Sequence, residues 1–212
     1  MDKNQEYLLE LMQHNNNDIE SLRTYAEENR IPIVDKMSLE AIKQVLRLKQ
    51  PRHILELGTA IGYSAMQFAS VSSDIHITTI ERDTEMQDRA SQNIEHFGYE
   101  HQITMIKGDA REQFETLKDN TFDVIFIDAA KAQTQRFFET YEPLLKLGGV
   151  VITDNILYHD FVADIDVVHS RNVRQMVKKL QKYNEWLVQH PRYETNFLNI
   201  DDGIAISVKK EN

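Results

Sequence analysis

The chain has 212 residues, long enough for one domain with a sizeable core, and its formal net charge is −10. An apolar fraction of 41 % and a charged fraction of 27 % are typical of a folded globular protein and argue against a disordered one. The chain has no cysteine, which excludes disulfides and zinc-thiolate sites, and no apolar run reaches the roughly 20 residues that cross a membrane. Its acidic, polar N-terminus predicts a helix and no signal peptide, so we expect a cytoplasmic protein without membrane contact.

Three helices are predicted at the N-terminus, over 3–14, 18–29 and 37–49, because apolar residues recur there at helical spacing. From Arg52 onward, short apolar runs alternate with helical segments. The predicted strands are 53–57, 75–80, 102–106, 122–127 and 149–153, and the helices between them are 62–71, 83–97, 110–117 and 133–145. This alternation indicates a doubly wound, mostly parallel α/β sheet with helices on both faces.

The last part of the chain departs from that alternation. A helix is predicted at about 169–188, and two strand-like runs follow it, YETNFLNI and GIAISVKK, joined by Asp201, Asp202 and Gly203. Asp-Gly between two such runs is typical of a hairpin, so a seven-stranded sheet with an antiparallel end is expected. No repeat or linker divides the sequence. We therefore predict a single domain over 1–212, with residues 1–50 forming helices that pack on the core.

A glycine turn follows the first predicted strand, and ligands of open α/β sheets bind beyond such strand ends. Gly58 and Gly62 lie four residues apart, with Glu56 before them and Ser64 after them. Glycines let the backbone turn sharply and approach a ligand closely, although such turns are equally common for structural reasons. Because the fingerprint Gly-x-Gly-x-x-Gly and the P-loop are both absent, a ligand without phosphates is favoured.

Acidic residues follow the second and third predicted strands. Glu81 is positioned to accept hydrogen bonds from ribose hydroxyls, while the plain alternative is an acid at a helix N-terminus. Asp109 is better explained as a cap of the following helix, and Ala110 beside it leaves room for a flat ring such as adenine.

Two carboxylates and an amide follow the fourth and fifth strands. Asp128 ends the run FDVIFI, and Asp154 and Asn155 end the run GVVIT. Neighbouring strands bring these groups to one edge of the sheet, where two carboxylates repel each other unless a cation or proton lies between them. Oxygen ligands in an incomplete set suit Mg²⁺, whereas an isolated Asp-Asn pair is usually a turn. The sequence therefore predicts a metal site of Asp128, Asp154 and Asn155.

Together these segments resemble the cation-dependent O-methyltransferases that use S-adenosylmethionine, the group that includes catechol and caffeoyl-CoA O-methyltransferases. The matching segments are LELGTAIGYS at 55–64, Glu81, GDA at 108–110, FIDAAK at 126–131 and TDN at 153–155. The resemblance spans about residues 37 to 208. It implies the Rossmann-like class I methyltransferase fold and a homodimer.

The resemblance also implies roles for single residues. The methionine part of the cofactor would be held by Glu56, the Gly58–Gly62 turn and Ser64, the ribose by Glu81, and the adenine would lie near Ala110. Met37 would close over the cofactor. Asp128, Asp154 and Asn155 would hold Mg²⁺, with Asp128 also near the cofactor's amino group. Lys131 corresponds to the general base, since a lysine near a cation and a sulfonium has a lowered pKa; an ordinary solvated lysine is the alternative.

The acceptor is less sharply defined. Ala129 and Ala130 stand where plant and animal relatives carry larger side chains, and the sequence closely resembles a bacterial subgroup that methylates 5-hydroxyuridine at the wobble position of tRNA. Tyr158 and Phe161 would stack on the base, and a basic helical stripe would meet phosphates. That stripe consists of Arg171, Arg174, Lys178 and Lys182. Core packing and solubility also explain these residues, and the net charge argues mildly against a broad nucleic-acid surface.

Three alternatives remain open. A small catechol or hydroxycinnamoyl-CoA-type acceptor suits the same metal site. An NAD-dependent oxidoreductase is disfavoured because the third glycine of the dinucleotide-binding fingerprint is missing. A non-enzymatic binding module is disfavoured because the carboxylates of Asp128 and Asp154 would have no evident structural use. Binding of S-adenosylmethionine but not NAD would separate the first of these from the other two.

Overall fold

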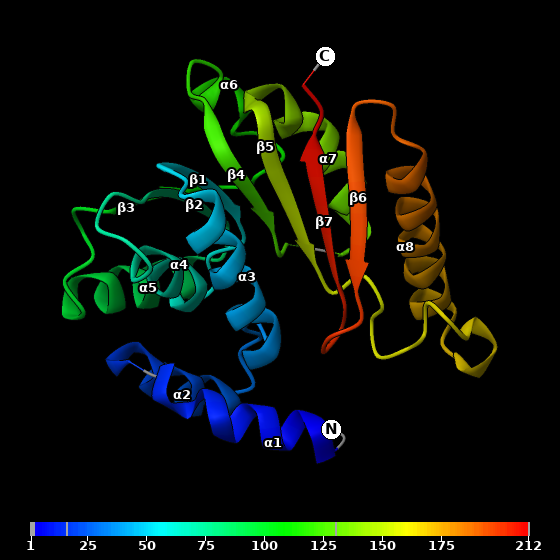
Figure 1. The fold of residues 1–212 in the computed structure, drawn as a ribbon, viewed down its shortest axis with the longest axis horizontal. Helices are drawn as coiled ribbons and strands as arrows, with labels where there is room; N and C mark the ends of the chain where they lie inside the picture. Colours follow the sequence, from blue (N-terminus) through cyan, green and yellow to red (C-terminus); the bar gives the residue numbers. More distant parts are fainter. Residues whose placement is uncertain (1–2, 16, 130, 212) are drawn as a thin grey trace.

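A seven-stranded sheet forms the centre of the protein (Figure 1) in a computed structural model that describes residues 3–15, 17–129 and 131–211. The strands are β1 (His53–Leu57), β2 (His76–Glu81), β3 (Ile103–Lys107), β4 (Phe122–Ile127), β5 (Leu145–Asp154), β6 (Tyr193–Leu198) and β7 (Ile204–Lys209). Their order across the sheet is β3-β2-β1-β4-β5-β7-β6. All neighbours run parallel except β7, which is antiparallel to β5 and to β6. The predicted doubly wound sheet with its antiparallel C-terminal hairpin is thus confirmed.

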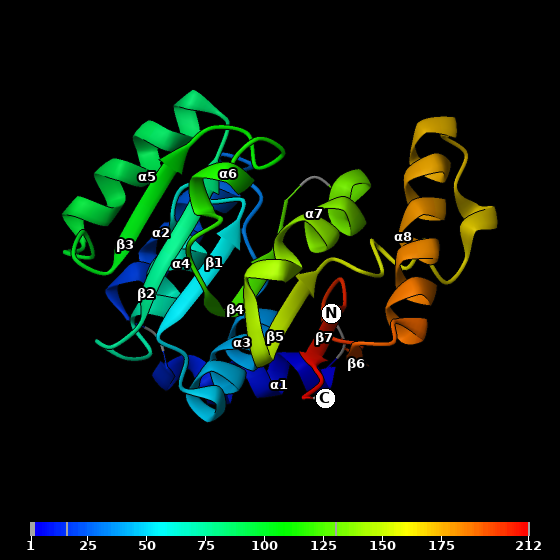
Figure 2. The ribbon, with the colours of Figure 1, turned by 90° about the horizontal axis from the view of Figure 1, so that it is seen from above.

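Helices lie on both faces of this sheet (Figures 1 and 2). The α-helices are α1 (Lys3–Leu11), α2 (Ser21–Glu28), α3 (Lys36–Lys49), α4 (Tyr63–Ala69), α5 (Thr84–His96), α6 (Phe114–Leu117), α7 (Thr134–Tyr141) and α8 (Arg171–Gln189). Short 3-10 helices are η1 (Met12–Asn15), η2 (Asp18–Glu20), η3 (Lys131–Gln133), η4 (Glu142–Leu144) and η5 (Ile165–Val167). In the described part of the chain, no helix is long and apolar enough to span a membrane.

Two clusters of buried side chains hold the helices against the sheet. The first joins α3, α4 and α5 to one face, with Leu39, Phe68 and Phe126 among its members. The second joins α6, α7 and α8 to the other face through residues such as Ile125 and Phe138. Successive strand residues point to opposite faces, so a strand that is covered on both faces is apolar throughout. This is why FDVIFI reads as a nearly continuous apolar run.

Several predicted helices proved shorter than expected, and two of them differ by half a turn or more for an identifiable reason. The predicted helix 133–145 ends at Tyr141, because Pro143 at the start of η4 has no N–H to continue the helix. The predicted helix 110–117 begins only at Phe114, since residues 109–112 form a turn. Asp109 caps that turn and not a helix: its Oδ1 accepts a hydrogen bond from the Arg111 N–H at 2.9 Å.

Candidate active site

A cavity of about 570 Å³ opens at the carboxyl ends of the parallel strands, the edge at which ligand binding is expected. Its described lining includes six of the predicted site residues, Gly58, Ser64, Glu81, Ala110, Asp128 and Asn155. The wall is completed by residues 31–34, which connect α2 to α3. The structure therefore brings residues of five strand ends and of the N-terminal region to one cavity.

The glycine turn after β1 lies directly against the end of β4. Gly58 has a φ of +102°, and a Cβ at this position would lie 2.6 Å from the carbonyl oxygen of Asp128. Gly62, with a φ of +83°, is in a left-handed conformation and caps the N-terminus of α4. A side chain at position 58 would push Asp128 away, so the contact requires glycine.

The Glu81 carboxylate lines the cavity and holds the glycine turn in place. Its Oε2 accepts hydrogen bonds from the N–H groups of Thr59 at 3.2 Å and Ala60 at 2.9 Å. Its Oε1 accepts from the N–H groups of Arg82 at 2.9 Å and Asp83 at 2.8 Å. Because a carboxylate offers about four lone-pair sites, ribose hydroxyls would share or replace some of these bonds. Ribose binding by Glu81 stays a prediction.

Glu56 is fully buried behind Ser64. The Ser64 hydroxyl donates to its Oε1 and the Thr79 hydroxyl donates to its Oε2, each at 2.5 Å. Burial raises the pKa of Glu56 to about 7, although the two hydroxyl donors oppose the shift; the nearby charge of Glu81 adds to it. Neither Glu56 nor Gly62 belongs to the described lining of the cavity. Glu56 thus reaches the cavity through Ser64, and direct contact with a cofactor stays a prediction.

The three predicted metal ligands lie together at the ends of β4 and β5. Ile127 and Thr153 are paired between these strands, so Asp128 and Asp154 are the next residues on each. The Asn155 side-chain Nδ2 donates to Asp128 Oδ1 at 3.1 Å, and the Asn155 N–H donates to Asp154 Oδ1 at 2.8 Å. A half-turn of the amide would present its oxygen where its nitrogen now lies.

The chemistry of this donor set fits a hard cation such as Mg²⁺, because both carboxylates and the amide offer oxygen. Across the described residues there is no group of three or more His, Cys, Asp or Glu arranged to hold a metal ion. The predicted set therefore depends on the amide oxygen of Asn155 as its third protein ligand.

The described lining of this cavity leaves out five predicted site residues: Met37, Glu56, Gly62, Lys131 and Asp154. Met37, in α3, lines a separate cavity of about 560 Å³ together with Met12 and Phe197. Its predicted closure over the cofactor stays a prediction; residues 31–34 line the wall of the main cavity. The apolar run IPIV between two helices was the available signal for them. Lys131 begins η3, but its side chain lies outside the described part of the structure, as does the whole of Ala130.

One member of the predicted basic stripe on α8, Arg174, is engaged within the protein, and the role of the stripe stays a prediction. The Arg174 guanidinium donates to the carbonyl oxygens of Ile165 at 3.0 Å and Val168 at 3.2 Å, so it fixes the loop before α8. A cavity of about 280 Å³ between α7 and α8 is lined by Arg136, by Lys179 and by Lys182, the last of which belongs to the predicted stripe. Glu139 also lines this cavity, which therefore carries net positive charge. It shares Ala132 with the main cavity.

Tyr158 and Phe161 lie on the loop that follows Asn155. Their ring centroids are 5.9 Å apart in an edge-to-face arrangement, and the His159 ring lies tilted beside Tyr158 at 4.7 Å. Both aromatic side chains are half-buried, and neither belongs to the described lining of the main cavity. Stacking on a substrate base stays a prediction for both.

Comparison with known proteins identifies a family. A family model described as O-methyltransferase matches residues 10–210. A solved structure from Staphylococcus aureus, provisionally named caffeoyl-CoA O-methyltransferase, is 60 % identical, covers 98 % of this chain and 100 % of its own, and has a TM-score of 0.95. An O-methyltransferase from Bacillus cereus, solved in complex with SAH, is 25 % identical over 97 % of this chain and 96 % of its own, with a TM-score of 0.83. An Arabidopsis thaliana protein, also provisionally named caffeoyl-CoA O-methyltransferase, is 29 % identical over 84 % of this chain and 77 % of its own.

Proposed function

The chain belongs to the O-methyltransferase family, and from this premise we propose that it transfers a methyl group from S-adenosylmethionine to the 5-hydroxyl of 5-hydroxyuridine at the wobble position of tRNA, giving 5-methoxyuridine. One observation carries the proposal: Asp128, beside Asn155, lines the same cavity as the Gly58 turn and Glu81. In this proposal the cofactor site, at Gly58 and Glu81, therefore lies directly beside the site for the acceptor oxygen, at Asp128 and Asn155.

Support for S-adenosylmethionine comes from the cavity and from a relative. The cavity volume of about 570 Å³ lies in the range of small-molecule sites. The B. cereus relative was solved with SAH, the demethylated product of this cofactor. In the proposed arrangement Ser64 binds the methionine part, Glu81 the ribose and Ala110 the face of the adenine.

Asp128, Asp154 and Asn155 would hold Mg²⁺. A divalent cation bound there would lower the pKa of an acceptor hydroxyl and neutralise the two carboxylates. The protein contributes the fixed position of these ligands, because Asp128 is held against Gly58 and Asn155 bonds to both carboxylates.

Lys131 is the proposed general base. In methyl transfer the acceptor oxygen forms a bond to the methyl carbon while the bond from that carbon to the sulfonium breaks, leaving a thioether. The hydroxyl proton passes to the neutral amine of Lys131, which begins η3 three residues after Asp128. General base catalysis of this kind contributes about 10²- to 10⁴-fold in rate.

An RNA acceptor is supported by the surroundings of the main cavity. Ala129 lines the cavity with a small side chain, which leaves space for a ring joined to a nucleic-acid backbone. The adjoining cationic cavity of Arg136, Lys179 and Lys182 offers charge to phosphates. Because the whole chain carries a net charge of −10, it should not attract nucleic acid in general. The positive charge of this one cavity therefore favours a specific contact with RNA.

A second candidate is a small catechol-like or hydroxycinnamoyl-CoA-type acceptor. The names of the S. aureus and A. thaliana relatives favour it, since both refer to caffeoyl-CoA. Adjacent oxygens of such a ring would meet the same ligands as the 5-hydroxyl and 4-carbonyl of the nucleoside.

Nucleoside mass spectrometry distinguishes the two acceptors. The purified protein, S-adenosylmethionine and Mg²⁺ are incubated with tRNA that carries 5-hydroxyuridine, and in parallel with a catechol and with caffeoyl-CoA. We expect 5-methoxyuridine in the tRNA, and cells without the protein should lose 5-methoxyuridine and accumulate 5-hydroxyuridine. Methylation of caffeoyl-CoA alone would replace the first candidate by the second.

We also propose a homodimer. Helix α1 has no buried residue, and it exposes Tyr7, Leu8 and Leu11 at one edge of the molecule (Figure 1). The nearby cavity of Met12 and Met37 is bordered by exposed Phe197 on the edge strand β6. A second copy would cover these apolar groups. Light scattering after size-exclusion chromatography should give twice the mass of 24.8 kDa; a monomer at micromolar concentration would contradict it.

A further inference from the structure

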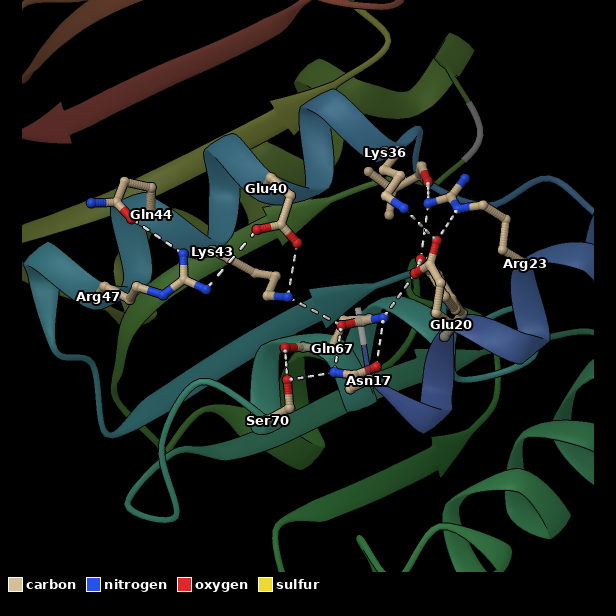
Figure 3. A network of polar contacts seen from close by, with 12 residues as sticks. Asn17, Glu20, Arg23, Lys36, Glu40, Lys43, Gln44, Arg47, Gln67 and Ser70 are labelled. Atoms are coloured by element: carbon tan, nitrogen blue, oxygen red, sulfur yellow. Dashed lines mark hydrogen bonds and ion pairs between the residues drawn. The ribbon is translucent and has the colours of Figure 1, made fainter. Parts of the chain in front are cut away.

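A network of polar side chains joins the N-terminal helices to α4 (Figure 3). At its centre the Arg23 Nε donates to Glu20 Oε1 at 3.0 Å, and Lys36 Nζ lies 3.4 Å from the same oxygen. The side chains of Arg23 and Glu20 are only 14 % and 16 % exposed, so solvent screens the pair weakly. On the α4 side, the Tyr63 hydroxyl donates to Glu20 Oε2 at 2.7 Å.

The Arg23 guanidinium also contacts two parts of the main cavity's wall. Its Nη2 donates to the carbonyl oxygen of Val34 at 3.1 Å and to the hydroxyl oxygen of Tyr63 at 2.9 Å. Its central carbon lies 5.1 Å from the centroid of the Tyr63 ring. Val34 and Tyr63 both line the cavity, and Tyr63 directly follows Gly62. One side chain thus links the N-terminal wall to the glycine turn.

The N-terminal wall depends on such contacts because it has no regular structure of its own. Residues 31–35 form neither helix nor strand, and Pro32 has no N–H to donate. Burial alone would raise the pKa of Glu20, but the Tyr63 hydrogen bond and the charges of Arg23 and Lys36 lower it below its ordinary value. Glu20 is therefore ionised at neutral pH and keeps Arg23 oriented.

We propose that Arg23 is a positioning residue that sets the affinity of the cavity for S-adenosylmethionine, by holding Val34 and Tyr63 in the binding arrangement. The proposal rests on the proposed use of this cavity for that cofactor. Arg23 does not belong to the described lining of the cavity, so we expect its loss to act on cofactor binding and to leave the methyl-transfer step itself intact at saturation. The hydrogen bonds of Arg23 order the cavity wall before the cofactor arrives. Cofactor binding then does not bear the entropic cost of ordering this wall.

Calorimetric titration with S-adenosylmethionine and with SAH measures this effect on the full chain. For Arg23→Ala we expect Kd and KM for the cofactor to rise about tenfold, the loss typical of one hydrogen bond to a charged group, with kcat at saturation within about twofold. Arg23→Lys, which keeps the charge beside Glu20, should recover part of the affinity. Tyr63→Phe, which removes only the hydroxyl, should weaken binding in the same direction.

Arg89→Ala is a matched control. The Arg89 guanidinium on α5 bonds to the hydroxyl of Tyr25 on α2 and lies 5.5 Å from its ring centroid. This second arginine–tyrosine contact also joins α2 to the core, but neither residue belongs to the described lining of the cavity. If the loss of either contact merely loosens α2, both variants should lose cofactor affinity to the same extent. If Arg23 positions the cavity wall, only Arg23→Ala should lose it.

The outcomes separate this proposal from the one it rests on. Unchanged cofactor affinity in Arg23→Ala, or equal weakening in Arg89→Ala, would overturn the positioning role. If Arg23→Ala fails to fold by its thermal transition, Arg23→Lys and Tyr63→Phe decide in its place. Failure of the unaltered protein to bind S-adenosylmethionine would instead contradict the proposed function.

Discussion

Gly58 and Asp128 touch: a Cβ on Gly58 would lie 2.6 Å from the carbonyl oxygen of Asp128 and 3.2 Å from its carbonyl carbon. The two residues follow β1 and β4, which are neighbours in the sheet. One belongs to the turn that the proposed cofactor approaches, and the other is a proposed metal ligand. The contact therefore fixes the distance between the proposed cofactor site and the proposed metal site, which we call the two half-sites, through backbone atoms alone.

Replacement of Gly58 by alanine should therefore damage both half-sites. Gly58→Ala combines backbone strain at a φ of +102° with a clash against backbone that cannot rotate away. Gly98→Ala is the control, because Gly98 has a φ of +76° and no atom within 4 Å of its would-be Cβ. In urea unfolding the control should lose about 1–2 kcal/mol and Gly58→Ala more. Only Gly58→Ala should also weaken binding of S-adenosylmethionine; equal behaviour of the two variants would refute the role of the contact.

Asp154→Ala tests the metal site. Loss of this carboxylate should abolish methyl transfer while the affinity for S-adenosylmethionine, measured by calorimetry, changes little, because Asp154 lies outside the described lining of the cavity. Chelation of divalent cations should have the same effect on the unaltered protein, and added Mg²⁺ should reverse it. Full activity in metal-free buffer would contradict the assignment.

Lys131→Ala tests the base. We expect kcat to fall by roughly 10²- to 10⁴-fold with little change in Mg²⁺ affinity, since the lost group accepts a proton and does not ligate the cation. Lys118→Ala, which removes a surface lysine paired with Glu115, is the control for loss of a positive charge. An unchanged rate in Lys131→Ala would leave the protein without an assigned base.

The strands, and the gathering of six predicted site residues at one cavity, were predictable because they depend on local pattern. The runs from HILEL to GVVIT carry their own signal of burial, and the strand ends then follow from the parallel topology. The hairpin followed from Asp202 and Gly203, since glycine supplies the positive φ of +81° found in that turn.

The remaining features were not predictable because they depend on contacts between distant segments. Helical spacing places Arg174 in the basic stripe, but only the fold reveals that its guanidinium bonds to the carbonyl oxygens of Ile165 and Val168. Likewise the Arg23 side chain on α2 bonds to the carbonyl oxygen of Val34 in the cavity wall, and Met37 lines a separate cavity beside β6. Helical periodicity predicts the face of the helix on which a residue lies, but it does not predict which distant segment packs against that face.

The cationic cavity predicts a charge-dependent effect on RNA. Lys179→Glu with Lys182→Glu should weaken tRNA binding and flatten its dependence on salt, while a catechol surrogate is methylated as before. Arg171→Glu with Lys178→Glu makes the same change of charge on the same helix, at exposed positions outside the described lining of that cavity. Filter binding at several salt concentrations should give the larger loss for the first pair. If both pairs lose tRNA affinity equally, the effect comes from net charge alone. If the first pair also loses methylation of the catechol surrogate to the same extent, the variant is misfolded.

Glu56 predicts a pH dependence of stability. Its pKa in the folded protein, about 7, lies above its ordinary value of 4.5, so the folded state holds the proton more tightly than the unfolded chain. The stabilisation is complete below about pH 4.5 and is lost as pH rises through about 7, with an upper limit of roughly 3 kcal/mol. Glu56→Gln keeps an oxygen acceptor for Ser64 or Thr79 and removes the titration. The difference in unfolding free energy between the two proteins should therefore change between about pH 5 and pH 8 in favour of the glutamine variant. A difference that is constant over this range would mean that Glu56 titrates normally despite its burial.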